Sequence, residues 1–198
     1  MTVATPELML RSIANDWTLA RWETLPADGN RYEVLDGVLY MTTVPSTFHQ
    51  WASQQVFRFL HDELDAPKGG FVFFAQFALV MPGADPAQPD LLYSADRGIF
   101  HYGRVQGIPA LLVEISSPTT IDLDSTIKRA VYAGAGVPEY WIVRLASRDA
   151  LVLSEPDPLR REYRSEVLVP ADGELVSPML PLRSPVARFF ADAPDTTL

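Results

Sequence analysis

Residues 110–128 read ALLVEISSPTTIDLDSTIK, and the fold that we predict follows from this stretch. Residues 110–115 are apolar except for Glu114, a pattern typical of a short strand that is buried on both faces. Ser-Ser-Pro-Thr-Thr ends this strand, and a helical pattern begins at Asp122. A carboxylate within such a strand is costly unless a cation or a hydrogen-bond donor meets it. Glu114 is therefore the first candidate for a functional residue.

The residues after Asp122 predict a helix and then a second strand. Gly136 and Pro138 end the helix, and residues 140–143, YWIV, form the next strand. A strand, a helix and a strand in this order make a right-handed crossover between two parallel strands. Active sites of open α/β sheets lie at the carboxyl ends of such strands, where Glu114 stands. Lys128 lies at the edge of the apolar seam of the helix, which comprises Leu123, Ile127, Ala130, Val131 and Gly134.

The flanking sequence predicts further strands and one long helix. Residues 31–43 form a β-hairpin about the two-residue turn Asp36-Gly37. A helix capped by Ser46 or Thr47 extends to about residue 64. We interpret His49, near its start, as an outward polar residue, with a place at the mouth of a site as the alternative. The other expected elements are a short helix over 18–25, strands over 71–80, 89–93, 150–153 and 162–169, and a last helix over 184–190.

The length and composition of the chain indicate one domain. With 198 residues, of which 47% are hydrophobic, the chain can bury a sizeable core, and we expect a single domain over 16–198 after a loosely ordered lead over 1–15. There is no run of 18 apolar residues and no basic, then apolar amino terminus, so we expect neither a membrane span nor a signal peptide. The chain has no cysteine, which excludes disulfides and thiolate metal sites and favours a cytoplasmic protein.

The charge balance restricts how the protein can bind nucleic acid. Asp and Glu number 25 against 16 Lys and Arg, which gives a net charge of −9. A protein with this charge repels a phosphate backbone, so tight DNA binding without metal is disfavoured. A site in which a divalent metal neutralises clustered carboxylates is still compatible with this charge. The chain has lysine only at Lys68 and Lys128, so position 128 could require a compact ammonium group.

Three residues converge on one predicted site. Asp90 begins a short apolar strand, Glu114 interrupts the central strand, and Lys128 lies on the helix that leaves it. Two carboxylates on neighbouring strands can share Mg²⁺, with the main-chain carbonyl of Ile115 as a further ligand. Such a metal lowers the pKa of a bound water and stabilises charge on a phosphoryl oxygen. A neighbouring lysine can orient the attacking water, so the residues indicate a metal-dependent site of the kind used in phosphoryl transfer.

These residues belong to a longer pattern. The chain reads RYEVLDGVLY from Arg31, FHQ from Phe48, QPDLLY from Gln88, LLVEISSPTT from Leu111, then Asp124, Lys128, Tyr132 and GVPEYWIV from Gly136. This order closely resembles the Uma family of putative restriction endonucleases, which is placed in the PD-(D/E)XK nuclease superfamily. The resemblance covers about residues 17–143 and is looser toward the carboxyl terminus. It implies a restriction-endonuclease-like α/β fold, with a mixed β-sheet core flanked by helices.

The resemblance also implies an activity and a set of site residues. It implies an endonuclease that needs Mg²⁺ or Mn²⁺ and hydrolyses DNA phosphodiester bonds. Asp90 matches the metal-binding aspartate of the superfamily, and Glu114 matches its acidic partner. Glu33 matches an early glutamate of the family, as a further metal ligand or as the holder of a metal-bound water.

Two positions depart from the usual pattern. Ser116 stands where the superfamily has a lysine two residues after the acid, and the resemblance implies that Lys128, on the following helix, supplies it. Arg144 stands where an aspartate is common, and we expect little effect on catalysis.

Cutting both strands of DNA needs two active sites, which makes a homodimer attractive.

The residues alone leave structural readings open. Glu114 could be a buried acid paired with Arg129 or Arg31. Lys128 could form a surface pair with Asp124 one helical turn away, Asp90 could be a turn residue and Glu33 a solvated hairpin position. The aromatic side chains of residues 71–77, together with Tyr140 and Trp141, are assigned to the core instead of to base-stacking platforms.

Two other functions are open as well. A catalytically silent nuclease-fold module, for protein interaction or self-assembly, agrees with the acidic balance and with the lack of an obvious basic DNA-binding arm. A hydrolase could instead use Asp90 and Glu114 as an acid/base pair without a metal, and it would survive a chelator.

Overall fold

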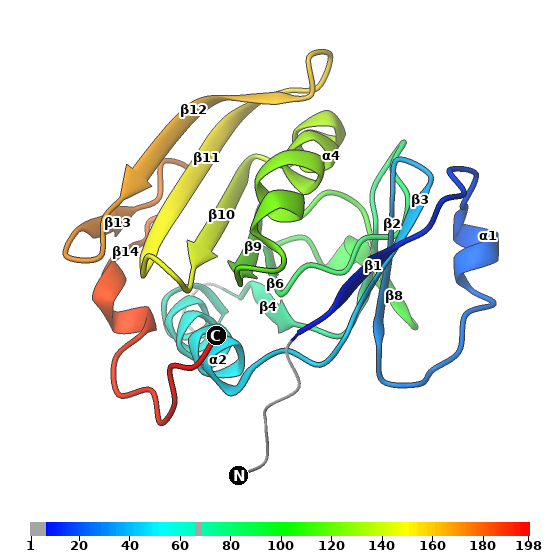
Figure 1. Ribbon diagram of the computed structural model, residues 1–198. Helices are drawn as coiled ribbons and strands as arrows, with labels where there is room; N and C mark the ends of the chain where they lie inside the picture. The colour runs from blue at the N-terminus through cyan, green and yellow to red at the C-terminus, as the bar shows by residue number, and fades with distance from the viewer. Residues whose placement is uncertain (1–6, 66–68) are drawn as a thin grey trace, which may run out of the picture.

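A mixed sheet of six strands forms the centre of the molecule, for which a computed structural model describes residues 7–65 and 69–198 (Figure 1). The strand order is β12-β11-β10-β9-β6-β4. Only β9 and β10 run parallel, and the other neighbours are antiparallel. The strands are β4 (Phe71–Phe74), β6 (Leu91–Ser94), β9 (Leu111–Ser116), β10 (Glu139–Arg144), β11 (Asp149–Asp157) and β12 (Glu162–Val169).

The predicted crossover connects β9 to β10. The intervening helix begins with wider π-helical turns, η3 (Leu123–Lys128), and continues as α4 (Arg129–Ala135). It ends at Gly136, whose φ of 82° lies in the left-handed region that glycine adopts without strain. β9 and β10 pair in parallel with Glu114 opposite Ile142. The strand, helix and strand that the sequence predicts are therefore confirmed.

Helices cover both faces of this sheet (Figure 1). Side chains alternate between the two faces of β9, so Leu111, Val113 and Ile115 pack with α2 (Thr47–Leu60), whereas Leu112 packs with the α4 side. Glu114 lies on the same face as Leu112. Its carboxylate is therefore enclosed between the sheet and the crossover helix.

A second sheet holds the predicted hairpin. Its strands are β1 (Met9–Arg11), β2 (Arg31–Leu35) and β3 (Val38–Thr42), in the order β1-β3-β2. The turn between β2 and β3 is Asp36-Gly37, and both residues have positive φ, as a tight hairpin turn requires. Part of the expected loose lead is thus a paired strand, and residues 1–6 of that lead lie outside the described residues.

The remaining elements are short. Ser46 caps α2, which continues through the π-helical turn η1 (His61–Asp65), and Thr18 caps α1 (Leu19–Trp22). None of the helices within the described residues is long and apolar enough to cross a membrane. The others are η2 (Arg97–Ile99), η4 (Val186–Phe189), β5 (Ala78–Val80), β7 (Phe100–His101), β8 (Arg104–Gln106), β13 (Glu174–Val176) and β14 (Arg183–Pro185).

Three predicted elements differ from the structure. The strand expected over 71–80 is interrupted, because β4 joins the edge of the central sheet while β5 pairs with β8 in a separate sheet. The helix expected over 184–190 is a β-strand followed by a short 3-10 turn. The helix expected over 18–25 ends at Trp22. In such short apolar segments the hydrophobic periodicity is too weak to distinguish a helix from a strand or to locate its ends.

The hairpin turn can be tested with two glycine substitutions. Gly37 and Gly29 both have positive φ, 75° and 88°. A Cβ at Gly37 would lie 2.4 Å from the main-chain oxygen of Asn15, whereas a Cβ at Gly29 would meet nothing within 4 Å. We expect Gly37→Ala to lower the free energy of unfolding by about 1–3 kcal/mol more than Gly29→Ala does, as measured by urea denaturation. Equal losses in the two variants would contradict the close approach of residue 15 to this turn.

Candidate active site

Three buried carboxylates, those of Glu33, Asp90 and Glu114, converge where the hairpin sheet meets the central sheet, and we call them the acid cluster. Glu33 lies on β2, Asp90 directly precedes β6, and Glu114 lies on β9. Each is at most 5% exposed. Carboxylates are rarely buried to this extent unless cations or hydrogen-bond donors compensate their charge.

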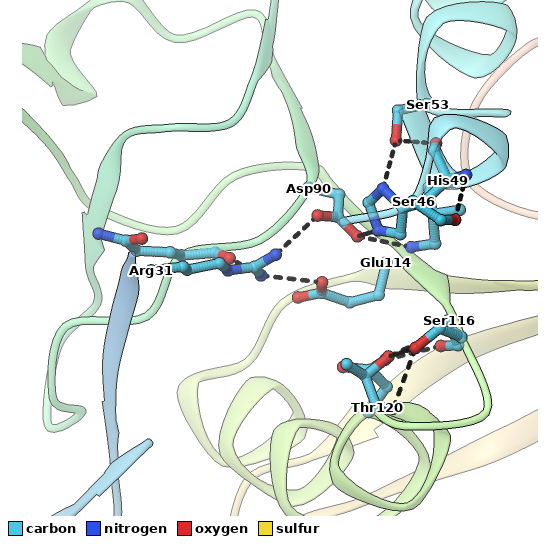
Figure 2. Close-up of polar contacts among 12 residues, drawn as sticks. Arg31, Ser46, His49, Ser53, Asp90, Glu114, Ser116 and Thr120 are labelled. Atoms are coloured by element: carbon cyan, nitrogen blue, oxygen red, sulfur yellow. Dashed lines mark hydrogen bonds and ion pairs between the residues drawn. The ribbon is translucent and has the colours of Figure 1, made fainter. Parts of the chain in front are cut away.

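Arg31 contacts every member of the acid cluster. Its Nη1 lies 2.7 Å from Asp90 Oδ1, its Nη2 lies 3.3 Å from Glu114 Oε2, and its Nε lies 3.5 Å from Glu33 Oε2. Figure 2 shows the guanidinium group reaching toward Asp90 and Glu114. Arg31 also donates a hydrogen bond to the main-chain oxygen of Gln88. Arg31 and Glu33 are two residues apart on β2, so both side chains lie on the face toward the cluster.

Lys128 supplies a second cation. Its Nζ lies 3.0 Å from Glu33 Oε1 and 3.0 Å from Glu114 Oε1, and it lies 3.6 Å from Asp124 Oδ1. The side chain is only 2% exposed. Tyr132 donates a hydrogen bond of 2.8 Å to Glu114 Oε1. Glu114 therefore receives an ammonium, a phenol and a guanidinium.

One face of the crossover helix carries a row of polar side chains that are buried against the sheet. Asp124, Lys128 and Tyr132 follow one another at intervals of four residues, and all three are buried. Of the predicted apolar seam, Ile127 and Ala130 are only half-buried. The sequence pattern therefore placed Lys128 at the edge of the buried face, whereas it lies within that face.

His49, on α2, contacts the carboxylate of Asp90. Its Nε2 lies 3.3 Å from Asp90 Oδ2, which also accepts a hydrogen bond of 2.8 Å from the main-chain amide of Ile115. Ser53 Oγ lies 3.4 Å from His49 Nδ1 and donates to the main-chain oxygen of His49. His49 is buried, so the interpretation as an outward residue is wrong. Figure 2 shows the ring directed from α2 toward Asp90.

The carboxyl groups of Asp90 and Glu114 titrate differently. Burial alone would raise the pKa of Asp90, but the charges of His49 and Arg31 hold this pKa well below its usual range. Burial raises the pKa of Glu114 above its ordinary value, and the charge of Lys128 is the main opposing influence. Burial alone would lower the pKa of His49, and the charge of Asp90 reverses this effect and raises it. Asp90 is thus the stronger acid of the two.

The structure brings together the four side chains that the sequence singled out, Asp90, Glu114, Lys128 and Glu33. It places Ile115 beside Asp90, where its main-chain amide, not its carbonyl, meets the carboxylate.

The structure also decides between the alternative pairings. Glu114 pairs with Arg31, whereas Arg129 contacts Glu166 at 2.7 Å. Lys128 and Asp124 approach each other, but they do so in the interior and not at the surface. Glu33 is a buried member of the cluster, so the reading as a solvated hairpin position is wrong. Asp90 lies in a bend before β6, as a turn residue would, and its carboxylate is nevertheless buried in the cluster.

The sequence analysis named Asp124 and Tyr132 as positions of the family pattern, and His49 as an alternative at the mouth of a site, without assigning their contacts in the charge network. It considered Arg31 only as one possible partner of Glu114. Asp124 accepts a hydrogen bond of 2.7 Å from Ser116 Oγ, so the residue that replaces the usual lysine holds a neighbouring acid. The signal that could have found Asp124 and Tyr132 is their spacing of four residues on either side of Lys128. The signal for Arg31 is its position two residues before Glu33 on a strand.

A cavity of about 200 Å³ opens onto the acid cluster. Its wall includes Gln50 and Ser53 of α2, Phe74 of β4 and Val44 after β3. The carboxylates and Lys128 therefore line this cavity together with residues of α2 and β4.

A family model for Uma2, described as "Putative restriction endonuclease", matches residues 18–187. The chain belongs to the Uma2 family. The resemblance drawn from the sequence is thereby confirmed, and membership of Uma2 supports nuclease function in general. No curated protein matches the sequence.

A solved structure is similar to this chain in fold. A protein from Anabaena variabilis ATCC 29413, described as a putative nuclease belonging to DUF820, superposes with a TM-score of 0.73 at 15% sequence identity. The match covers 88% of this chain and 98% of that chain. The likeness shows the fold, and it confirms the predicted restriction-endonuclease-like α/β class with its mixed sheet and flanking helices.

The acid cluster provides the donor chemistry of a hard divalent cation. Mg²⁺ and Mn²⁺ take oxygen ligands, and three carboxylates already converge on one positive group. Within residues 7–65 and 69–198, no three His, Cys, Asp or Glu side chains are arranged to hold a metal ion. The guanidinium group of Arg31 pairs with oxygens of all three carboxylates, and the ammonium of Lys128 lies 3.0 Å from two of them. These oxygen donors are of the kind that a divalent cation takes, and in this structure they are paired with cations of the chain itself.

Removing Lys128 tests whether the charges of the cluster are balanced by its ammonium. We expect Lys128→Met to lower the free energy of unfolding by about 3–5 kcal/mol, because Glu33 and Glu114 lose a buried cation. The double variant Lys128→Met/Glu33→Gln removes one of the two acids and should recover part of this loss in urea denaturation. Arg129→Ala, which breaks a more exposed pair, is the control and should cost about 0–1 kcal/mol. A loss for Lys128→Met no larger than that of the control would contradict the charge balance.

Proposed function

We propose that this protein is an endonuclease that hydrolyses DNA phosphodiester bonds with the help of Mg²⁺ or Mn²⁺. The observation that carries the proposal is the convergence of three buried carboxylates on one cation, beside the buried ammonium of Lys128. Asp90 and Glu114 would hold the metal, with Glu33 and the main-chain carbonyl of Ile115 as further ligands. When bound, a divalent metal lowers the pKa of a water and stabilises negative charge on a phosphoryl oxygen.

Lys128 has the geometry to position the attacking water. Its ammonium lies 3.0 Å from both Glu33 and Glu114, so two ion pairs hold it at the cluster. An ammonium group has three donors, and two of them meet these acids. The third can donate to the attacking water or to the charge that develops on the phosphate. The acids around Lys128 raise its pKa, although burial and Arg31 act in the opposite direction, so the group remains protonated and acts as a donor.

Arg31 and a divalent cation compete for the same carboxylates. The guanidinium group balances the negative charge of the acid cluster while no metal is bound, which makes the buried acids tolerable. Arginine also binds phosphate well through its planar fork of donors. Arg31 would therefore exchange carboxylate partners for a phosphate of the substrate when a metal enters.

Two observations favour other functions. The pairing of Arg31 with all three acids suits a catalytically silent module, because the cluster is neutralised without any metal. The pKa values of Asp90 and Glu114 are displaced in opposite directions, which suits an acid/base pair that works without metal. Each alternative makes a different prediction for metal binding or for chelation.

Calorimetric titration with Mn²⁺ separates the metal enzyme from the silent module. We expect wild type to bind Mn²⁺ and Arg31→Gln to bind it roughly tenfold more tightly or better, because the competing charge is gone. Asp90→Ala should bind at least about tenfold more weakly than wild type. The control is Arg21→Gln, which breaks an exposed pair with Asp16 and should leave Mn²⁺ affinity unchanged. Absence of binding to both wild type and Arg31→Gln would overturn the metal assignment.

Nicking of supercoiled plasmid in Mn²⁺ tests the activity itself. We expect Asp90→Ala and Lys128→Ala to lose at least about 100-fold of the wild-type rate, because both contribute to charge stabilisation at the phosphate. Arg129→Ala, whose side chain pairs with Glu166, should nick like wild type. Nicking should stop when a chelator is added. Equal nicking by all four proteins would indicate a contaminating nuclease, and nicking that survives the chelator would favour the metal-free acid/base pair.

A further inference from the structure

A second hollow adjoins the acid-cluster cavity on the outer side of α2. It encloses about 570 Å³, and Gln50, Ser53 and Phe74 line both hollows. The two hollows are therefore neighbours, and the second is lined by residues of α2 and by Phe74 of the edge strand β4. Figure 1 shows where α2 and β4 lie in the fold. We call the second hollow the α2 groove.

Aromatic side chains form the walls of the α2 groove. The rings of Phe57 and Phe74 meet edge to face, with centroids 5.1 Å apart. Phe74 is nevertheless 59% exposed, so much of its ring is open to the groove and the solvent. Trp51 is fixed by a hydrogen bond of 2.8 Å from its Nε1 to the main-chain oxygen of Ala191. The expectation that the aromatic side chains of residues 71–77 belong to the core is wrong for Phe73 and Phe74, which are 41% and 59% exposed.

Amide side chains stand beside these rings. Gln50 and Gln54 lie one helical turn apart on α2, and both are exposed where they line the groove. In the part of the chain that the structure describes, neither side-chain amide forms a hydrogen bond. An amide presents both donors and an acceptor, which is the combination that the edge of a nucleobase can meet.

The charge of the groove differs from that of the rest of the molecule. The protein carries a net charge of −9, yet no described residue that lines the groove is acidic, and Arg58 lies at its wall. Phosphate contacts are weak for a protein of this charge, so a bound DNA strand needs uncharged contacts. Stacking of bases on aromatic rings is such a contact, and every base offers a face for it.

We propose that the α2 groove binds one unpaired nucleobase of a DNA strand whose phosphodiester lies against the acid cluster. The base stacks on Phe74, and Gln50 and Gln54 hydrogen-bond to its edge. The inference rests on the proposed function, because the nuclease reaction places the strand at the cluster. It makes single-stranded DNA, or an unpaired base within a duplex, the preferred substrate. Base stacking would also explain why the ring of Phe74 is largely exposed instead of being packed in the core.

Fluorescence anisotropy with a labelled single strand of about 12 nucleotides tests the groove. Ca²⁺ replaces the catalytic metal, and a gel run afterwards shows that the strand is intact. We expect Phe74→Ala to weaken binding about 5- to 150-fold, and Phe74→Trp to restore it, because an aromatic ring is what stacking requires. Phe73→Ala is the matched control: Phe73 packs against Phe77 and Phe100 on the other face of β4, and its variant should bind like wild type.

Further measurements distinguish base stacking from phosphate contacts and from self-association. A strand of the same length with abasic positions should bind the wild type as weakly as the intact strand binds Phe74→Ala. The dependence of affinity on salt should be the same for wild type and Phe74→Ala, because stacking releases no counterions. Equal binding by Phe74→Ala and Phe73→Ala, or equal binding of intact and abasic strands, would overturn the proposal. Sedimentation that shows Phe74→Ala breaking a dimer without weakening DNA binding would overturn it in favour of a second copy of the chain.

The outcomes separate this inference from the proposed function. If the protein nicks plasmid in Mn²⁺ but Phe74→Ala binds DNA as tightly as wild type, the proposed role of the groove is refuted and the proposed nuclease function stands. Base-dependent binding that requires Phe74, without any nicking, would refute the nuclease and leave a DNA-binding protein.

Discussion

Buried negative charge must be met by positive charge, and this requirement determines how the molecule is assembled around the acid cluster. Three carboxylates lie within reach of one guanidinium group, in an interior where an isolated ion is costly. The chain meets the requirement from three directions. β2 brings Arg31, the crossover helix brings Lys128, and α2 brings His49.

The fold makes such convergence possible because two sheets and two helices meet at one place. The alternation of side chains along β9 directs Glu114 to the face that the crossover helix covers. The π-helical turns at the start of that helix direct Asp124 and Lys128 to the same face. Because the cluster recognises positive charge, it suits either an arginine or a divalent cation. This exchange relates the observed pairing of Arg31 to the proposed metal-dependent reaction.

Much of the fold could be predicted from sequence because the decisive elements have strong local signals. An apolar run with one acid, a Ser-Pro break and a helical seam predict the crossover, and Asp36-Gly37 fixes the hairpin. The four site side chains could be named because their types and order matched a known family, whereas their mutual pairing depended on long-range geometry. Local period could not reveal that Arg31 reaches three acids, two of them more than fifty residues away. Nor could it reveal that the strand expected over 71–80 divides between two sheets, which exposes Phe74.

The acid cluster is proposed to hold either the guanidinium group of Arg31 or a divalent metal ion, but not both. An anomalous difference map from a crystal soaked in Mn²⁺ tests this exchange at the atoms concerned. We expect a peak among the carboxylate oxygens of Asp90 and Glu114, with the side chain of Arg31 turned away from them. A map with no peak at the cluster, and with Arg31 still paired to both acids, would contradict the exchange.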